Sequence, residues 1–168
     1  MVKKIYLLRH AETFQLTGNQ KDIDRELTAT GFRDAVLIGK FMAGKSWIPD
    51  AIYSSSAQRA NDTTHLVAEQ LNYSSSKINY MEELYQATTR VLINIINQFN
   101  EEEDAVLVVG HNPHLSYLVE LLTGEEIGAL DPGGLVKLTA ETDQWPSISS
   151  GTCSLSEVIF PVVLRGQG

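Results

Sequence analysis

Four short segments of the chain each carry residues suited to binding or attacking a phosphate. They contain Arg9 and His10, Arg25, Arg59, and His111. Arginine presents a planar, permanently charged fork that binds two oxygens at once, and a neutral imidazole can act as a nucleophile. A phosphoryl group in transfer needs several fixed cations or donors around its oxygens. These residue types therefore suit phosphoryl chemistry, provided that the fold brings them together.

The two histidines follow apolar runs that are typical of buried strands. Residues 3–8 precede Arg9 and His10, and residues 105–109 precede His111. Two buried strands that each end near a histidine predict a site at the carboxyl edge of a mostly parallel sheet, where open α/β folds bind ligands. Arginines around His10 would also lower its pKa and keep a nitrogen lone pair available for attack.

Strand-like and helix-like runs alternate along the whole chain. Strands are expected at 3–8, 50–53, 77–80, 105–109, 133–139 and 155–163, the last two at a sheet edge, and helices after 28–31, after 54–56, at 88–99 and from 112 to about 122. This alternation predicts an α/β fold, a three-layer α/β/α sandwich with a mostly parallel central sheet. We expect a single domain over residues 1–168, with ragged residues at 165–168.

Several local details also follow from the pattern. The first helix is expected to bury one face, made of Phe32, Ala35, Val36, Gly39 and Phe41 or Met42. The hydroxyls of residues 54–56 are expected to cap the second helix. Asn112 and Pro113 suit the N-cap and first position of a helix whose free N–H groups would favour an anion.

Composition excludes several classes of function. A net charge of -8, with dispersed basic residues, disfavours nucleic-acid binding. The N-terminal apolar run before Arg9 is too short for a signal peptide or a membrane span, and the single cysteine, Cys153, fits a reducing compartment. We therefore expect a soluble, cytoplasmic protein. The acidic run at 101–104 is interpreted as a solvated turn.

Four motifs carry a family resemblance. The segment 7–13, with Arg9-His10, resembles the Arg-His-Gly signature of the histidine phosphatase superfamily, which includes phosphoglycerate mutases. Residues 53–63 and 109–113 are similar to its Ser-Ser-Pro-x-x-Arg segment and its second histidine motif. Residues 22–31 resemble the Arg-Pro-Leu-Thr-x-x-Gly stretch of its short, SixA-type phosphohistidine phosphatase branch. The motifs occur in family order and imply a phosphoglycerate mutase-like fold.

The resemblance implies a role for each matching residue. His10 would be the nucleophile and become a phosphohistidine, while Arg9, Arg59 and His111 would clamp the phosphoryl group. A second set would contact the phosphate or the rest of the substrate: Arg25, Asp22 and Asn112. Ala11, Ser56 and Glu26 depart from the family's usual glycine and prolines.

The general acid is the open part of the site. Mutase-like members use a glutamate before the middle helix, where this chain has Glu82 and Glu83, and we expect Glu83 to take that role. Asp22 lies near the acidic position of the short branch and is the alternative. A leaving imidazole needs little acid help, so a phosphohistidine substrate would not require a strong acid.

The sequence thus predicts a phosphatase that works through a covalent phosphohistidine, without metal or cofactor. The expected substrate is phosphohistidine in a protein such as a histidine phosphotransfer domain, and the expected state is a monomer. The alternative is a phosphomonoesterase for a metabolite or sugar phosphate. A mutase is disfavoured because the chain has no long insertion that could hold a bisphosphate. A non-catalytic phosphate-binding module is also disfavoured, because Arg9, His10, Arg59 and His111 are all present. His111 and His114 lack the carboxylate or cysteine partners of a metal site.

Overall fold

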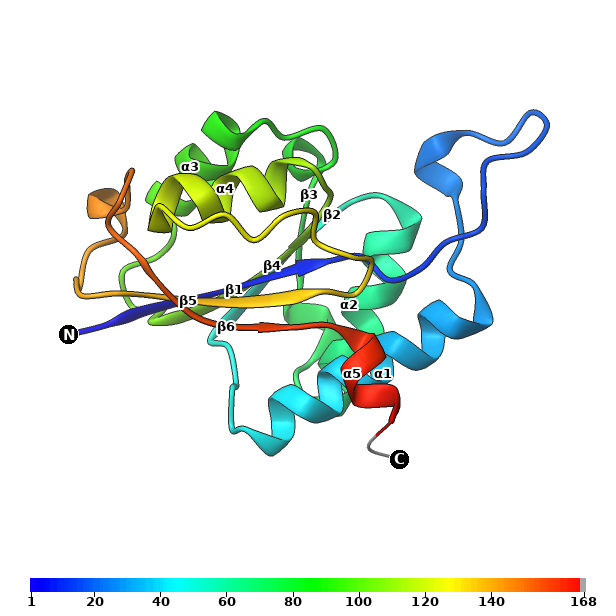
Figure 1. Ribbon diagram of the computed structural model, residues 1–168, viewed down its shortest axis with the longest axis horizontal. Helices are drawn as coiled ribbons and strands as arrows, with labels where there is room; N and C mark the ends of the chain where they lie inside the picture. The colour runs from blue at the N-terminus through cyan, green and yellow to red at the C-terminus, as the bar shows by residue number, and fades with distance from the viewer. Residues whose placement is uncertain (167–168) are drawn as a thin grey trace.

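The computed structural model describes residues 1–166, and a six-stranded sheet forms its centre (Figure 1). The strands lie in the order β3-β2-β4-β1-β5-β6. Their bounds are β1 Lys3–Arg9, β2 Ala51–Ser55, β3 Asn79–Met81, β4 Ala105–Gly110, β5 Leu135–Ala140 and β6 Ser154–Ile159. Strands β1 to β4 pair in parallel, whereas β5 runs antiparallel to both β1 and β6. The predicted mostly parallel sheet is confirmed.

Helices cover both faces of this sheet. They are α1 Ala29–Gly44, α2 Gln58–Gln70, α3 Thr89–Asn97, α4 His114–Thr123 and α5 Pro161–Arg165, with short 3-10 turns η1 Asp22–Asp24, η2 Ser75–Lys77, η3 Glu82–Leu84 and η4 Trp145–Ser147. In β1, Ile5 and Leu7 pack with residues of α3 and α4, while Tyr6 and Leu8 pack with residues of α1 and α2. Successive strand side chains point to opposite faces, so one strand supplies two cores. The predicted α/β/α sandwich is therefore confirmed.

The C-terminal part differs from the expectation. The predicted strand at 155–163 is wrong beyond Ile159, because Pro161 begins helix α5 and has no N–H to give to a sheet. Strand β5 lies inside the sheet, between β1 and β6, so of these two C-terminal strands β6 alone is at an edge, and β3 forms the opposite edge. Of the residues expected to be ragged, Arg165 belongs to α5 and bonds Asp34, while residues 167 and 168 lie outside the described residues.

Two further interpretations need correction. Phe32 is 47% exposed, because the buried face of α1 passes through Gly31, Asp34, Ala35 and Ile38 instead. The acidic run at 101–104 is more than a solvated turn, since its carbonyl and carboxylate oxygens bind the ammonium group of Lys3, whose residue is 1% exposed. In residues 1–166 no helix has both the length and the apolar character that crossing a membrane requires.

Candidate active site

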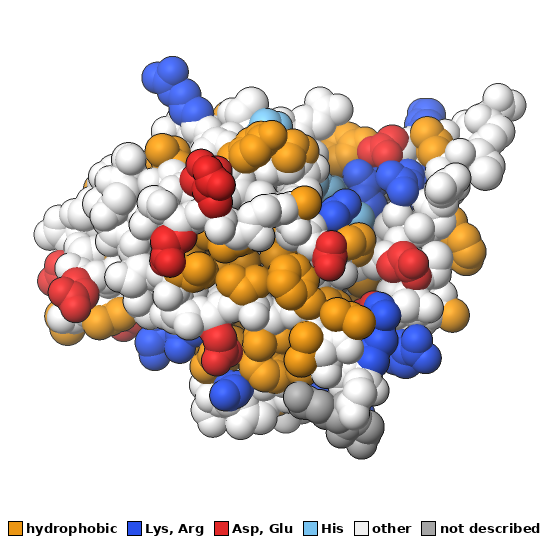
Figure 2. Space-filling view, viewed as in Figure 1, with side chains coloured by type: hydrophobic (Ala, Val, Ile, Leu, Met, Phe, Trp, Pro, Cys, Tyr) orange, Lys and Arg blue, Asp and Glu red, His pale blue; other side chains and the backbone are white. Residues whose placement is uncertain are grey.

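The two histidines meet at the carboxyl edge of the sheet, where β1 and β4 end side by side. Arg9 pairs with Gly110 in the parallel register, and the His10 N–H donates to the Gly110 carbonyl at 3.1 Å. The imidazole rings of His10 and His111 have centroids 5.3 Å apart. Figure 2 shows blue cationic side chains beside pale blue histidine surface at this end of the molecule.

His10 is buried and held in one tautomer. Its Nδ1 lies 2.8 Å from the Ala11 carbonyl oxygen. A carbonyl only accepts hydrogen bonds, so Nδ1 carries the proton and Nε2 keeps a lone pair. Burial first, and then the neighbouring His111, Arg59 and Arg9, lower the pKa of His10 to about 3 despite the bond to Ala11. The ring is therefore neutral at physiological pH, and Nε2 keeps a free lone pair.

The segment after His10 is fixed by the first turn of α1. Thr28 caps this helix by accepting from the Gly31 N–H at 3.0 Å, and its own N–H donates to the Glu12 carbonyl. A Cβ on Gly31 would lie 2.2 Å from that carbonyl oxygen. Glycine therefore lets the helix approach the segment after His10, which explains the Leu-Thr-x-x-Gly stretch in physical terms.

Arg9 and Arg59 are anchored through their terminal nitrogens. Arg9 donates from Nη1 to the Leu130 carbonyl at 2.8 Å, and Arg59 donates from Nη1 to the Asp22 carbonyl at 2.8 Å. The Nε of each arginine is buried and has no protein partner within residues 1–166. Burial lowers the pKa of Arg9, and the positive charges of Arg59 and Arg25 lower it further, whereas Asp131 raises it. Two unpartnered donors on two neighbouring cations make a place for an anion.

Arg25 and Asp22 enter the site from the loop that carries η1, which projects from the body of the molecule (Figure 1). Arg25 donates from Nη2 to Thr13 Oγ1 at 2.7 Å and from Nη1 to Asp22 Oδ1 at 3.3 Å. Asp22 Oδ2 accepts from Arg59 Nη2 at 3.1 Å and from the Tyr85 hydroxyl at 2.5 Å. These bonds connect the loop to α2 and to the segment after η3.

Tyr85 had no role assigned from the sequence, yet it contacts three site residues. Besides Asp22, its ring lies edge-on to His111, with centroids 5.7 Å apart, and the Arg59 guanidinium lies 5.7 Å from the ring centroid. The bond from Tyr85, followed by those from Arg59 and Arg25, lowers the pKa of Asp22 to about 2 in spite of partial burial. Asp22 is therefore a carboxylate across the physiological range.

His111 is oriented by Ser55, another residue that sequence reasoning did not select. His111 Nε2 lies 2.8 Å from Ser55 Oγ, and Ser55 Oγ also accepts the Ala57 N–H. Burial and the charge of Arg59 lower the pKa of His111 to about 4. The prediction that residues 54–56 cap α2 through their hydroxyls is wrong, since the N-cap is Ala57, without a side-chain bond, and Ser55 is used at the site.

Asn112 does not cap α4. The helix starts at His114 after a cis Asn112–Pro113 peptide, and Asn112 Nδ2 donates to Ser116 Oγ at 2.7 Å. Its Oδ1 is buried and has no partner in the part of the chain that the structure describes, so the amide retains an acceptor beside His111.

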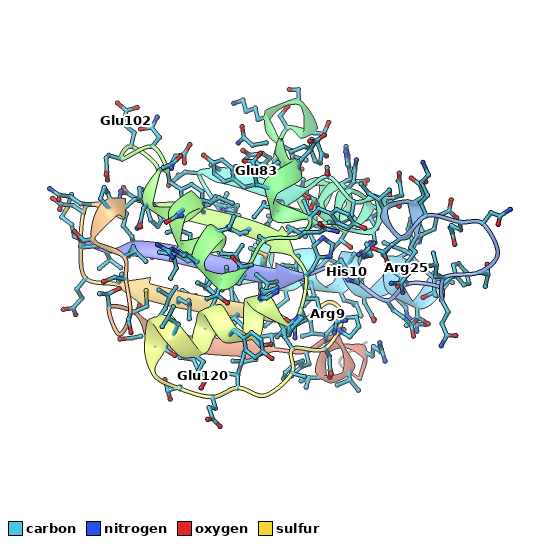
Figure 3. All side chains as sticks on the ribbon, turned by 90° about the horizontal axis from the view of Figure 1, so that it is seen from above. Arg9, His10, Arg25, Glu83, Glu102 and Glu120 are labelled. Atoms are coloured by element: carbon cyan, nitrogen blue, oxygen red, sulfur yellow. The ribbon has the colours of Figure 1, made fainter. Side chains whose placement is uncertain are left out.

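Glu82 and Glu83 lie on η3, three and two residues before Tyr85, and both are exposed. Figure 3 places Arg9, His10 and Arg25 at one end of the sheet and Glu83 apart from them. Among residues 1–166, Asp22 is the only carboxyl group that bonds Arg25 or Arg59, and no carboxyl group bonds Arg9, His10 or His111. The structure therefore brings Asp22 into the site but not Glu83.

A family comparison agrees with this geometry. Residues 5–85 match the model of the histidine phosphatase superfamily, branch 1. The chain belongs to the histidine phosphatase superfamily. An uncharacterised protein of Mycobacterium leprae is 31% identical over 121 residues, which cover 70% of this chain and 71% of that protein. An uncharacterised chloroplastic protein of Arabidopsis thaliana is 26% identical over 133 residues, 74% of this chain, and the match spans only 61% of the plant protein.

Solved structures place this histidine phosphatase in the SixA-type branch. The SixA protein of Agrobacterium tumefaciens, provisionally assigned as a phosphohistidine phosphatase, is 27% identical with a TM-score of 0.80, covering 95% of this chain and 99% of that one. A protein histidine phosphatase SixA complexed with tungstate shares the fold with a TM-score of 0.82 at 24% identity, covering 96% and 99%. A mycobacterial glucosyl-3-phosphoglycerate phosphatase has the same fold at 15% identity, with a TM-score of 0.66 and coverage of 93% and 98%.

Proposed function

We propose that this histidine phosphatase removes the phosphoryl group from phosphohistidine in another protein, with His10 as the intermediate carrier. One observation carries the choice of substrate. The carboxyl group that bonds Arg25 and Arg59 is Asp22, whose pKa of about 2 leaves it without a proton to give. A site without a ready acid suits a leaving group that departs without one.

In the first step Nε2 of His10 attacks phosphorus. The bond between phosphorus and the substrate's imidazole nitrogen breaks, and its electron pair stays on that nitrogen, which takes a proton from solvent. One phosphorus–nitrogen bond replaces another, so the covalent exchange is close to balanced. An alkoxide leaving group would instead need a proton from the protein, a contribution typically worth about 10²–10⁴ in rate.

The clamp supports this step by stabilising charge on the phosphoryl oxygens. The Nε donors of Arg9 and Arg59 are the groups without protein partners, and they suit the equatorial oxygens. If the Ser55 hydroxyl donates to His111 Nε2, the proton of neutral His111 lies on Nδ1, which is buried and also without a partner. Neutral His111 would then add a third donor to the clamp.

In the second step a water molecule attacks phosphorus on His10. The phosphorus–Nε2 bond breaks, phosphate leaves, and the neutral imidazole is regenerated. The bond from Nδ1 to the Ala11 carbonyl persists through both steps, so the ring keeps its orientation. The likeness to the Agrobacterium SixA protein supports this substrate class.

A phosphomonoester of a small molecule is the second candidate. It is favoured by the position of Glu83 on η3, because the same segment continues into Tyr85, which contacts Asp22 and His111. In this candidate function Glu83 would be the general acid for the leaving alcohol.

A substrate panel separates the two candidates. A phosphohistidine-containing phosphotransfer domain, p-nitrophenyl phosphate and several sugar phosphates are compared by kcat/KM at neutral pH. We expect the phosphohistidine protein to exceed every ester by at least about 100-fold, the smaller end of a general-acid contribution. A sugar phosphate hydrolysed as well as the phosphohistidine protein would contradict the proposed substrate.

A further inference from the structure

The Asp22 carboxylate accepts hydrogen bonds from three side chains of the candidate phosphate site. This is unexpected, because a site that binds an anionic phosphate gains nothing from a negative charge of its own. Arg59, Arg25 and Tyr85 all donate to its carboxylate, and Arg59 donates to its main-chain carbonyl as well. A carboxylate close to a phosphate site repels the ligand, so its presence there needs a reason.

The two hydrogen bonds from Arg59 to Asp22 indicate that Asp22 holds the Arg59 guanidinium in place. Nη1 bonds the Asp22 carbonyl at 2.8 Å and Nη2 bonds its Oδ2 at 3.1 Å, so Asp22 holds the terminal edge of the guanidinium. The group is planar, and a fork held along one edge has its remaining donors fixed in direction. Among residues 1–166 Nε of Arg59 has no protein partner, and it is buried in a residue that is 6% exposed.

The same carboxylate ties Arg25 to Arg59. Its two oxygens bond different arginines, Oδ1 with Arg25 and Oδ2 with Arg59. Two guanidinium groups repel each other, and a shared counter-ion offsets that repulsion. Tyr85, which follows η3, donates to Oδ2 and so fixes the carboxylate from a third part of the chain.

We propose that Asp22 is a positioning residue for phosphoryl transfer: its carboxylate and carbonyl hold the Arg59 fork in one orientation and keep Arg25 beside it. The inference rests on the proposed function, in which these arginines surround the phosphoryl group. It gives Asp22 a task other than the acid or direct substrate contact that the sequence suggested.

A positioning role predicts a split between transfer and anion binding. Transfer depends on alignment, and a misplacement of about 1 Å can cost roughly 100-fold in rate. Binding of a simple dianion depends mainly on net charge, which becomes more positive when a carboxylate is removed. Asp22→Ala should therefore slow transfer and leave tungstate affinity unchanged or higher.

The experiment measures phosphorylation of the enzyme by phosphoramidate in a single turnover, together with tungstate binding by calorimetry. The variants are Asp22→Ala, Arg59→Lys, the double variant, and Asp24→Ala as a matched control, because Asp24 is an exposed carboxylate on the same 3-10 turn. We expect a loss of roughly 10- to 100-fold for Asp22→Ala, the size found for residues that orient a site's ligands. Asp24→Ala should match the wild type.

The double variant tests whether Asp22 acts through Arg59. Lysine keeps the charge of Arg59 but has no planar fork for Asp22 to hold. In the Arg59→Lys background, Asp22→Ala should therefore lower the phosphorylation rate by less than about threefold, because the effects of contacting residues are not additive. Fully additive losses would overturn the proposal, as would an Asp22→Ala rate equal to that of Asp24→Ala, or a tungstate affinity that falls in step with the rate. A wild-type protein that forms no phosphoenzyme would overturn the proposed function and this inference together; a normal wild-type rate with any of those results would overturn only the role of Asp22.

Discussion

The Ala11 carbonyl oxygen lies 2.8 Å from Nδ1 of His10 and fixes which ring nitrogen can attack. A histidine that donates to the carbonyl of its own neighbour needs no distant partner to set its tautomer. The remaining nitrogen, Nε2, belongs to a neutral ring, because burial lowers the pKa of His10 to about 3.

The phosphoenzyme should therefore carry its phosphate on Nε2 of His10. The bond is a phosphoramidate, so it should be labile in acid and stable in alkali, and NMR of the alkali-stabilised protein should identify the nitrogen. His10→Ala should form no phosphoenzyme, whereas His65→Ala, which removes a helix residue that contacts Tyr80, should behave as the wild type. Full turnover by His10→Ala, or phosphate on Nδ1, would contradict the assignment.

The pH profile of kcat/KM should lack an acid limb near the usual histidine pKa. With the pKa of His10 at about 3 and that of His111 at about 4, both rings stay neutral down to about pH 5. Values of kcat/KM for phosphoramidate, measured from pH 8 to pH 5 and corrected for substrate ionisation, should show no change caused by protonation of His10 or His111. A loss of activity centred near pH 6.5 would show that one of the rings titrates normally.

Stability should depend on pH through the same rings. Their pKa values are lower in the folded protein than in the unfolded chain, where histidine has a pKa near 6.5, so the unfolded chain binds more protons at lower pH. The free energy of unfolding should therefore fall as the pH is lowered from about 6.5 toward 3. Urea unfolding at several pH values measures this slope, and His111→Asn should reduce it. An equal slope in that variant would count against a depressed pKa of His111.

Activity should not require a metal ion, because Arg9, Arg25 and Arg59 supply the positive charge that magnesium gives in other phosphoryl-transfer enzymes. A chelator should leave the rate unchanged within about twofold, and vanadate or tungstate should inhibit by occupying the arginine clamp. Strict dependence on added magnesium would refute this prediction.

Glu83→Gln distinguishes the two substrate classes. Under the proposed function the loss on phosphohistidine should stay below about threefold, because the departing imidazole takes its proton from solvent. A loss of about 100-fold on esters alone would assign Glu83 as their general acid. Glu102→Gln, at an exposed glutamate in the turn before β4, is the control. A large loss on phosphohistidine would contradict the idea that this substrate needs no acid.

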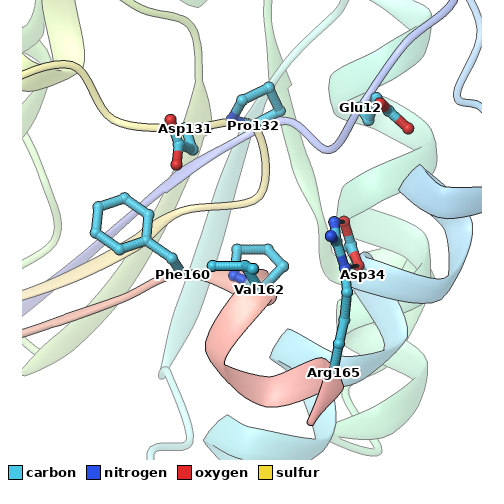
Figure 4. A pocket seen from close by; sticks show the side chains of 8 residues that line it. Glu12, Asp34, Asp131, Pro132, Phe160, Val162 and Arg165 are labelled. Atoms are coloured by element: carbon cyan, nitrogen blue, oxygen red, sulfur yellow. Dashed lines mark hydrogen bonds and ion pairs between the residues drawn. The ribbon is translucent and has the colours of Figure 1, made fainter.

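Helix α5 should contribute to stability through one ion pair. Arg165 donates from Nε and Nη2 to the two carboxylate oxygens of Asp34, which is 1% exposed, beside a cleft lined by Glu12 and Phe160 (Figure 4). Arg165→Ala leaves that carboxylate without its partner and should lower the free energy of unfolding by about 2–3 kcal/mol.

The control for this change is Arg33→Ala, which removes an exposed arginine from α1 next to Asp34. Chemical denaturation should show a change within about 0.5 kcal/mol for that variant, as for ordinary surface substitutions. Equal effects of the two variants would mean that the pair contributes nothing specific.

Local pattern in the sequence was enough to predict the layers of the fold and the meeting of two histidines. Alternating apolar runs predict strands and helices, and parallel strands deliver their carboxyl ends to one edge, so His10 and His111 were expected at the same edge. The strand order then makes β1 and β4 neighbours. The capping of α1 by Thr28 is also local, because it joins residues three apart in one helical turn, whereas the need for Gly31 comes from the Glu12 carbonyl, which only the folded chain brings close.

Only the tertiary structure decided what surrounds those histidines. The bonds from Tyr85 to Asp22 and from His111 to Ser55 join residues 63 and 56 positions apart, and no periodicity relates them. The pKa values of His10 and Asp22 likewise depend on burial and on charges brought in from other elements. Side-chain partners across loops and the dielectric around a group are properties of the packed chain, and that is why Asp22 and Glu83 could be separated only in three dimensions.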